Sequence, residues 1–151
     1  MENNADIVVR SPNNEIKLIV EVKGLDHSSA DWAAKFRRNL LTHNVIPKTE
    51  YFLLALPDFL YLWRAGNTSD MVPPDYTART FSVLQRYLTS LDSEPKYIAE
   101  EGLQIALTSW LRDATFSPSK PPVGSEAYKL LVESGLLDAI DNTEVSTQPY
   151  A

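Results

Sequence analysis

The sequence contains no cysteine and only two histidines in 151 residues. Without cysteine the chain can form no disulfide, no thiolate zinc site, no iron–sulfur cluster and no cysteine nucleophile, and two histidines leave little scope for histidine-based metal chemistry. No run approaches the ~20 apolar residues that span a bilayer, and the opening residues, MENNADIVV, lack the basic and apolar segments of a signal peptide. We therefore expect a cytoplasmic protein with no membrane partner.

The remaining composition is ordinary for a globular domain, with 44% hydrophobic and 23% charged residues. The length matches one domain of about 100 to 150 residues, so we expect a single domain over 1–151. The net charge is −6, and it lies entirely in the second half: residues 1–64 hold 8 basic and 8 acidic side chains, residues 65–151 hold 6 and 12. This distribution weakens a nucleic-acid interpretation without excluding it, because phosphate binding depends on the potential of one face.

Hydrophobic patterning predicts a ββαββ motif over residues 5–64. Two β-branched runs, 5–10 and 16–22, flank a turn sequence in which asparagine tolerates left-handed backbone, which is typical of a hairpin. Residues 28–44 have the spacing of an amphipathic helix that begins at Ser28, and 51–56 and 59–63 are apolar enough for buried strands. Phe59, Tyr61 and Trp63 alternate along the last strand and could stack on bases, although core packing is the more common use of that pattern.

The second part, 75–140, is predicted to be helical. Helices are expected after Pro74, over 99–114 and over 126–134, the last ending at Gly135. The polar end, 141–151, is expected to fray. The whole is therefore predicted to be an α/β protein with a small mixed sheet flanked by helices.

The register of the first hairpin brings three charged residues together. If Asn13 and Asn14 close the turn, opposed positions sum to 27, so Asp6 faces Glu21 and Arg10 faces Lys17. Alternation then places Asp6, Glu21 and Lys23 on one face. The other face is wholly apolar and consists of Ile7, Val9, Leu18, Val20 and Val22.

Two opposed carboxylates repel one another unless a cation lies between them. Lys23 can supply one charge, and a divalent metal could supply the rest. Asp6, Glu21, the carbonyl oxygen of Val22 and water would form the oxygen-only shell that Mg²⁺ prefers, and Mn²⁺ could replace it. Such a metal could activate water for phosphodiester hydrolysis, with Lys23 orienting the water or stabilising charge at phosphorus.

This order of residues resembles the PD-(D/E)XK nuclease superfamily, whose fold is that of restriction endonucleases. Asp6, then Glu21-Val22-Lys23, then a helix and the strand YFLLAL follow the family's order across roughly the first 56 residues. The phrase LLALPDFLYLWRAGN is similar to small uncharacterised nuclease-like proteins of bacteria. The resemblance implies a metal-dependent DNA endonuclease with Asp6 and Glu21 as metal ligands and Lys23 as the catalytic lysine.

The chain departs from the family pattern at its N-terminus. The family core normally opens with a helix that contributes an acidic residue, whereas only five residues precede Asp6. Either the chain is a fragment or a shortened version, or a downstream helix takes that place. A shortened scaffold could instead be a catalytically inactive domain that binds protein or nucleic acid. Oligomerisation is compatible with either function.

Basic residues outside this motif are candidates for DNA contact. Family members often bear a supporting Gln or Lys on the helix after the motif, where this chain has Lys35 and Arg38 on the polar arc and Arg37 at its flank. The like charges of Arg10 and Lys17 near the hairpin tip would gain from a phosphate between them, although simple solvation explains them as well.

Overall fold

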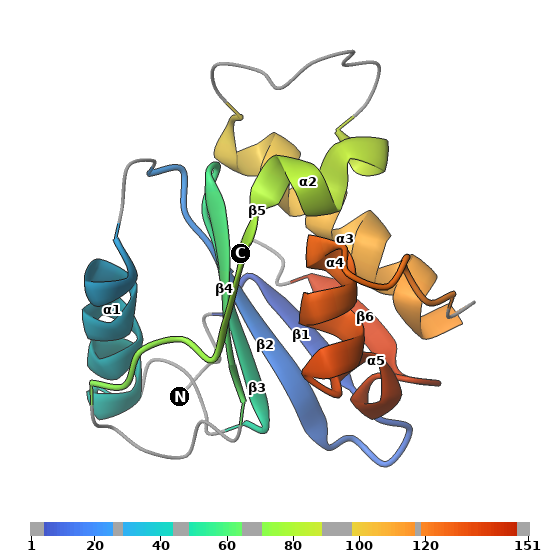
Figure 1. Ribbon diagram of the computed structural model, residues 1–151. Coiled ribbons are helices and arrows are strands. Elements are labelled where there is room, and N and C mark those ends of the chain that lie inside the picture. Colours follow the sequence, from blue (N-terminus) through green and yellow to red (C-terminus); the bar gives the residue numbers. More distant parts are fainter. Residues whose placement is uncertain are drawn as a thin grey trace.

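A six-stranded mixed sheet forms the centre of the computed structural model, which describes residues 5–25, 29–43, 49–64, 71–88, 98–116 and 119–147 (Figure 1). The strand order is β5-β4-β3-β2-β1-β6. Only the central pair, β2 and β3, is parallel; the other neighbours are antiparallel. The strands are β1 (Ile7–Arg10), β2 (Ile16–Val22), β3 (Tyr51–Ala55), β4 (Phe59–Arg64), β5 (Tyr76–Arg79) and β6 (Glu144–Thr147).

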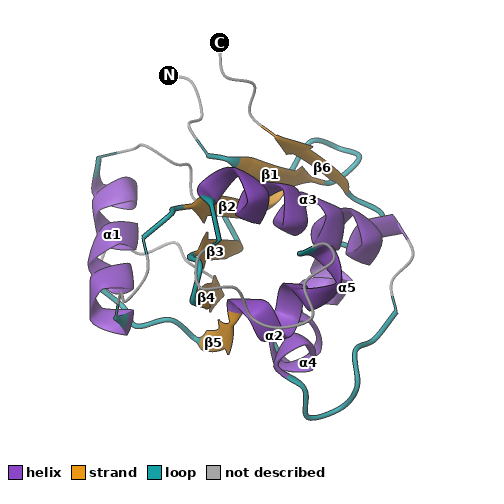
Figure 2. Cartoon of the chain, turned by 90° about the horizontal axis from the view of Figure 1, so that it is seen from above, coloured by secondary structure: helices purple, strands orange, loops and turns teal. Residues whose placement is uncertain are grey.

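Helices cover both faces of this sheet. Helix α1 (Ala30–Thr42) lies on one face, and the later helices lie on the other (Figures 1 and 2). The later helices are α2 (Thr80–Leu84), the 3-10 helix η1 (Gln85–Tyr87), α3 (Glu100–Phe116), α4 (Glu126–Tyr128), the π-helix η2 (Lys129–Glu133) and α5 (Leu136–Ala139). The predicted α/β class, a small mixed sheet flanked by helices, is confirmed. Among the described residues, no helix has the length and apolar character needed to cross a membrane.

The first hairpin forms as its sequence predicts, apart from its tip. Ile7, Val8 and Val9 pair with Val20, Ile19 and Leu18, the register in which opposed numbers sum to 27. Asn14 has φ 70°, the left-handed conformation that asparagine tolerates. A bulge after Val9 then shifts the pairing, so Arg10 pairs with Ile16. The prediction that Arg10 faces Lys17 was therefore wrong.

Three further differences concern element ends and edges. Helix α1 is capped by Ser29, whose Oγ accepts the Trp32 amide N–H at 3.1 Å, and the predicted start at Ser28 lies outside the described residues. Strand β5, at one edge of the sheet, was not predicted. Within the polar segment expected to fray, β6 pairs with β1 along its whole length. Backbone pairing with β1 and burial of Val145 order this part of the segment despite its polarity.

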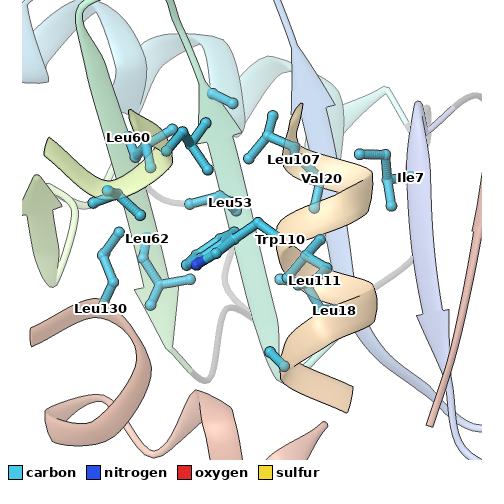
Figure 3. Packing of buried hydrophobic residues seen from close by; sticks show 14 of the residues in the cluster. Ile7, Leu18, Val20, Leu53, Leu60, Leu62, Leu107, Trp110, Leu111 and Leu130 are labelled. Atoms are coloured by element: carbon cyan, nitrogen blue, oxygen red, sulfur yellow. The ribbon is translucent and has the colours of Figure 1, made fainter. Parts of the chain in front are cut away.

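The larger core lies between the sheet and α3. Six apolar residues at helical spacing on α3 are buried against the sheet: Leu103, Ala106, Leu107, Trp110, Leu111 and Ala114. Figure 3 shows Trp110 among Leu53, Leu62 and Leu111, where its ring fills the space between the helix and the strands. This core fixes α3 against the sheet.

Truncation of Trp110 is expected to destabilise the protein strongly. Trp110→Ala removes a ring that is 5% exposed and leaves a cavity, so the free energy of unfolding should fall by about 3 to 5 kcal/mol. Urea denaturation followed by far-ultraviolet circular dichroism measures this loss. Ile105→Ala, on the exposed side of the same helix, is the matched control and should change stability by less than about 1 kcal/mol. Equal losses in the two variants would contradict the assigned helix orientation.

The smaller core lies between the sheet and α1. Tyr61 and Trp63 are buried there at 3% and 1% exposure, so their alternation serves packing, and their rings are closed to a nucleobase. Arg37 is also buried, with its guanidinium 5.5 Å from the centroid of the Trp63 ring. This burial removes Arg37 from the candidates for phosphate contact.

Candidate functional site

The predicted acidic pair lies at the open end of the first hairpin, on the face covered by α1. Asp6 directly precedes β1, and Glu21 is the second-last residue of β2. Continuing the hairpin register places Asp6 opposite Glu21. On the other side, Glu21 pairs with Leu54 of β3, whose side chain belongs to the α1 core. The two carboxyl groups therefore share one sheet face at the edge of a packed apolar layer.

A backbone hydrogen bond fixes the position of the Asp6 carboxylate. The Val22 amide N–H donates to Asp6 Oδ2 at 2.7 Å. Because β1 starts only at Ile7, this side chain takes over the role of a strand partner for the end of β2. The contact also holds the Asp6 side chain toward β2, where Glu21 lies.

Glu21 is a buried carboxyl group with an unused oxygen. Its side chain is 4% exposed, and Oε1 has no hydrogen-bond partner. Burial raises the pKa of Glu21 to about 8, with a further contribution from the adjacent Asp6 charge, while Lys23 acts in the opposite direction. Asp6 also contributes through a side-chain hydrogen bond. Burial therefore favours the protonated form of Glu21 near neutral pH.

Lys23 completes the predicted triad. Its amide N–H donates to the Ala55 carbonyl oxygen at 3.0 Å, which extends the pairing of β2 with β3 beyond Val22. Its ammonium nitrogen lies 5.7 Å from the centroid of the Phe36 ring on α1. The ammonium is close enough to lower the pKa of Glu21. The structure thus brings Asp6, Glu21 and Lys23 together.

A fourth charged residue at this end was not predicted. Glu100 opens α3, and its Oε1 accepts the Gly24 amide N–H at 2.8 Å. Its charge also raises the pKa of Glu21. The available signal was the acidic pair Glu100-Glu101 in the first turn of a predicted helix, but such pairs usually serve only the helix dipole. A downstream helix therefore brings an acidic residue to the site.

Neutralising Glu100 is expected to lower the pKa of Glu21. Glu100→Gln retains an oxygen that can accept the Gly24 N–H, but it removes a negative charge, so ionisation of Glu21 becomes easier. Side-chain ¹³C resonances followed through a pH titration measure the change. The adjacent variant Glu101→Gln should leave the Glu21 midpoint unmoved. An unchanged midpoint in Glu100→Gln would show that the two groups are not coupled.

The oxygen donors at the open end of the first hairpin are of the kind that a hard divalent cation prefers. The residues there offer carboxylate oxygens, one of which is buried and unpartnered, and no softer donor. The Val22 carbonyl oxygen stays a predicted third ligand. Across the described ranges, no group of three or more His, Asp or Glu side chains is arranged to hold a metal. An ion here would therefore rely on the Asp6 and Glu21 pair, supplemented by backbone oxygen and water.

The basic candidates fall into two separate places. Lys35 and Arg38 are exposed on α1, the helix that covers the acidic pair. Arg10 and Lys17 lie at the opposite end of the hairpin, about 13 Å from Asp6 along the strand. There Lys17 forms an ion pair with Glu15 at 3.4 Å.

A cavity of about 450 Å³ lies at the hairpin tip and is lined partly by Arg10. Arg10 pairs with Ile16 on one side and with Glu144 of β6 on the other. The pairing therefore gives no support to joint phosphate binding by Arg10 and Lys17. The two residues are not opposed, and each has an acidic neighbour. Of the four basic candidates, Lys35 and Arg38 are exposed on α1, the helix that packs on the same sheet face as the acidic pair.

Comparisons of this chain with protein-family models, with curated proteins and with solved structures found no match.

Proposed function

We propose that this protein is a metal-dependent, endonuclease-like hydrolase of phosphodiester bonds in DNA. The observation that carries the proposal is the buried Oε1 atom of Glu21, which has no hydrogen-bond partner. Glu21 lies next to Asp6, and the positive charge of Lys23 is close enough to lower the pKa of Glu21. A buried carboxyl oxygen without a hydrogen-bond partner is costly to keep in a fold and is typical of a functional position. The order of these residues along the chain resembles the PD-(D/E)XK motif.

In this proposal the two acidic side chains bind the metal, and the lysine contacts the phosphate. Asp6 and Glu21, with the Val22 carbonyl oxygen, would hold Mg²⁺ or Mn²⁺, and Glu21 would release its proton to solvent to do so. When bound, the ion would polarise a phosphodiester oxygen and lower the pKa of an attacking water. Lys23 would donate hydrogen bonds to a phosphate oxygen and so stabilise the negative charge that grows there.

We propose DNA as the substrate because α1, which packs on the same sheet face as the acidic pair, carries exposed basic residues. The exposed side of α1 presents Lys35 and Arg38, which could contact phosphates on either side of a scissile bond. Helix α3 brings Glu100 to the site, and this supports the idea that a downstream helix fills the place of the family's leading helix. We further propose a cytoplasmic location, and a homo-oligomer where both strands must be cut.

A second candidate is a nuclease-like domain that binds but does not cut. The observation that favours it is the burial of Glu21, which raises its pKa to about 8 and so favours the uncharged acid over a metal-binding carboxylate. The absence of a three-carboxylate cluster among the described residues points the same way. Such a domain would bind DNA or protein without needing a metal.

Nicking of supercoiled DNA separates the two candidates. The purified chain, incubated with Mg²⁺ or Mn²⁺ and in parallel with a chelator, should convert supercoiled plasmid to open circles only when the metal is present. Lys23→Ala should reduce the rate about 100-fold or more, and Glu101→Gln, an exposed acidic residue on α3, should not. Equal nicking by Lys23→Ala would reveal a contaminant. No nicking under any condition would favour the binding domain.

A further inference from the structure

We propose that the stacked rings of Trp32 and Phe36 position the Lys23 ammonium beside Glu21. This inference deepens the proposed function and rests on it for its catalytic meaning. The two rings lie one helical turn apart on α1, with centroids 5.3 Å apart and planes inclined by only 9°. The Lys23 ammonium nitrogen lies over the Phe36 ring, 5.7 Å from its centroid. That distance is within the range of a cation–π interaction.

Lys23 needs such a support because its side chain is long. Its backbone is held by one hydrogen bond to Ala55, but four rotatable side-chain bonds separate that anchor from the ammonium group. In the part of the chain that the structure describes, no ion pair joins Lys23 to a carboxylate. The contact with Phe36 is therefore what restricts the ammonium.

An aromatic support has a chemical advantage over an acidic one. A carboxylate partner would neutralise the lysine and occupy its N–H donors. The face of a ring attracts the cation through its quadrupole and leaves those donors available to a phosphate oxygen. The Lys23 ammonium would then face the reacting phosphate with its orientation fixed and its positive charge retained.

The aromatic pair is itself held at two points. The Trp32 amide N–H donates to the capping Ser29 at 3.1 Å, which fixes the first turn of α1. Both rings are partly buried and pack against the smaller core. Trp32 lies against Phe36 in a nearly parallel stack, so it restricts the tilt of the ring under Lys23. Helical periodicity puts these two rings on one face of the helix, but it gives no sign of their contact with Lys23.

The test compares Phe36→Leu with Phe36→Tyr and measures the NMR chemical shift of the Lys23 side chain. In the wild-type chain the Lys23 ε-methylene protons should resonate upfield because of the ring current of Phe36. Phe36→Leu should remove this shift, and Phe36→Tyr should retain it. Phe59→Leu, which truncates another partly buried aromatic residue of the same core, is the matched control and should leave the shift in place. A wild-type resonance at the position of a free lysine would overturn the proposal.

Kinetics tests whether positioning matters for the reaction. Phe36→Leu should lower kcat for metal-dependent nicking about 5- to 10-fold with KM unchanged, and Phe36→Tyr should recover most of the rate. An unchanged kcat in Phe36→Leu, or equal losses in Phe36→Leu and Phe59→Leu, would overturn the proposal. If the wild-type chain shows no metal-dependent nicking, the proposed function fails, and the positioning of Lys23 is then decided by the NMR resonance alone.

Discussion

Glu21→Gln should be more stable than the wild-type protein at pH 8.5 and about equally stable at pH 4.5. In the folded, metal-free chain the pKa of Glu21 is raised from 4.5 to about 8 by burial and by Asp6. Between these values the unfolded chain loses the proton while the folded chain retains it, so the wild-type protein loses stability as pH rises. The loss should reach about 3 to 5 kcal/mol once pH passes the folded pKa, and glutamine, which does not titrate, avoids it.

Urea denaturation at intervals between pH 4.5 and 8.5 measures this difference. Other groups titrate in the same range, so the quantity to follow is the free energy of unfolding of Glu21→Gln minus that of the wild type. Glu101→Gln, whose side chain is exposed, should track the wild type at every pH. A difference between Glu21→Gln and wild type that stays constant with pH would mean that Glu21 is not a buried, protonated acid.

Glu21→Gln is also expected to abolish nicking although it improves folding. The substitution keeps the size of the side chain and one oxygen but removes the negative charge that the proposed metal requires. The rate should fall about 1,000-fold, the scale of losing charge stabilisation worth several kcal/mol in the transition state. Asp6→Asn, which keeps an oxygen for the Val22 amide N–H, should lose activity similarly. Full activity in a stably folded Glu21→Gln would contradict the proposed role.

The opposite effects on stability and activity make this variant informative. A residue with a purely structural role would lose activity only through loss of folding. Here the same carboxyl group lowers the stability of the fold at alkaline pH and is proposed to bind the metal that the reaction needs. Such a conflict between stability and activity is expected of a functional site.

Much of the acidic pair could be predicted because it depends on local rules. Period-two alternation fixes which residues of β1 and β2 share a face, and the tolerance of Asn14 for left-handed backbone fixes the turn. These rules are enough to bring Asp6, Glu21 and Lys23 together. The bulge at the tip, which moves Arg10 opposite Ile16, leaves no comparable mark in the sequence.

The parts that could not be predicted depend on distant contacts. Strand β6 is polar and short, and it is ordered by pairing with β1, which lies more than 130 residues earlier in the chain. Glu100 is adjacent to Gly24 only because the buried face of α3 packs on the sheet. The position of Phe36 under Lys23 likewise follows from the docking of α1. Such placements result from tertiary packing, which local periodicity does not encode.

Binding of Mn²⁺ followed by titration calorimetry at pH 7 tests the central claim most directly. The wild-type chain should bind one ion and release a proton, visible as a dependence of the heat on the ionisation enthalpy of the buffer, because Glu21 must lose its proton to become a ligand. Glu21→Gln should lose both the binding and the proton release, whereas Glu101→Gln should keep both. Equal binding by the wild type and Glu21→Gln, or no binding by the wild type, would contradict a cation site at the open end of this hairpin.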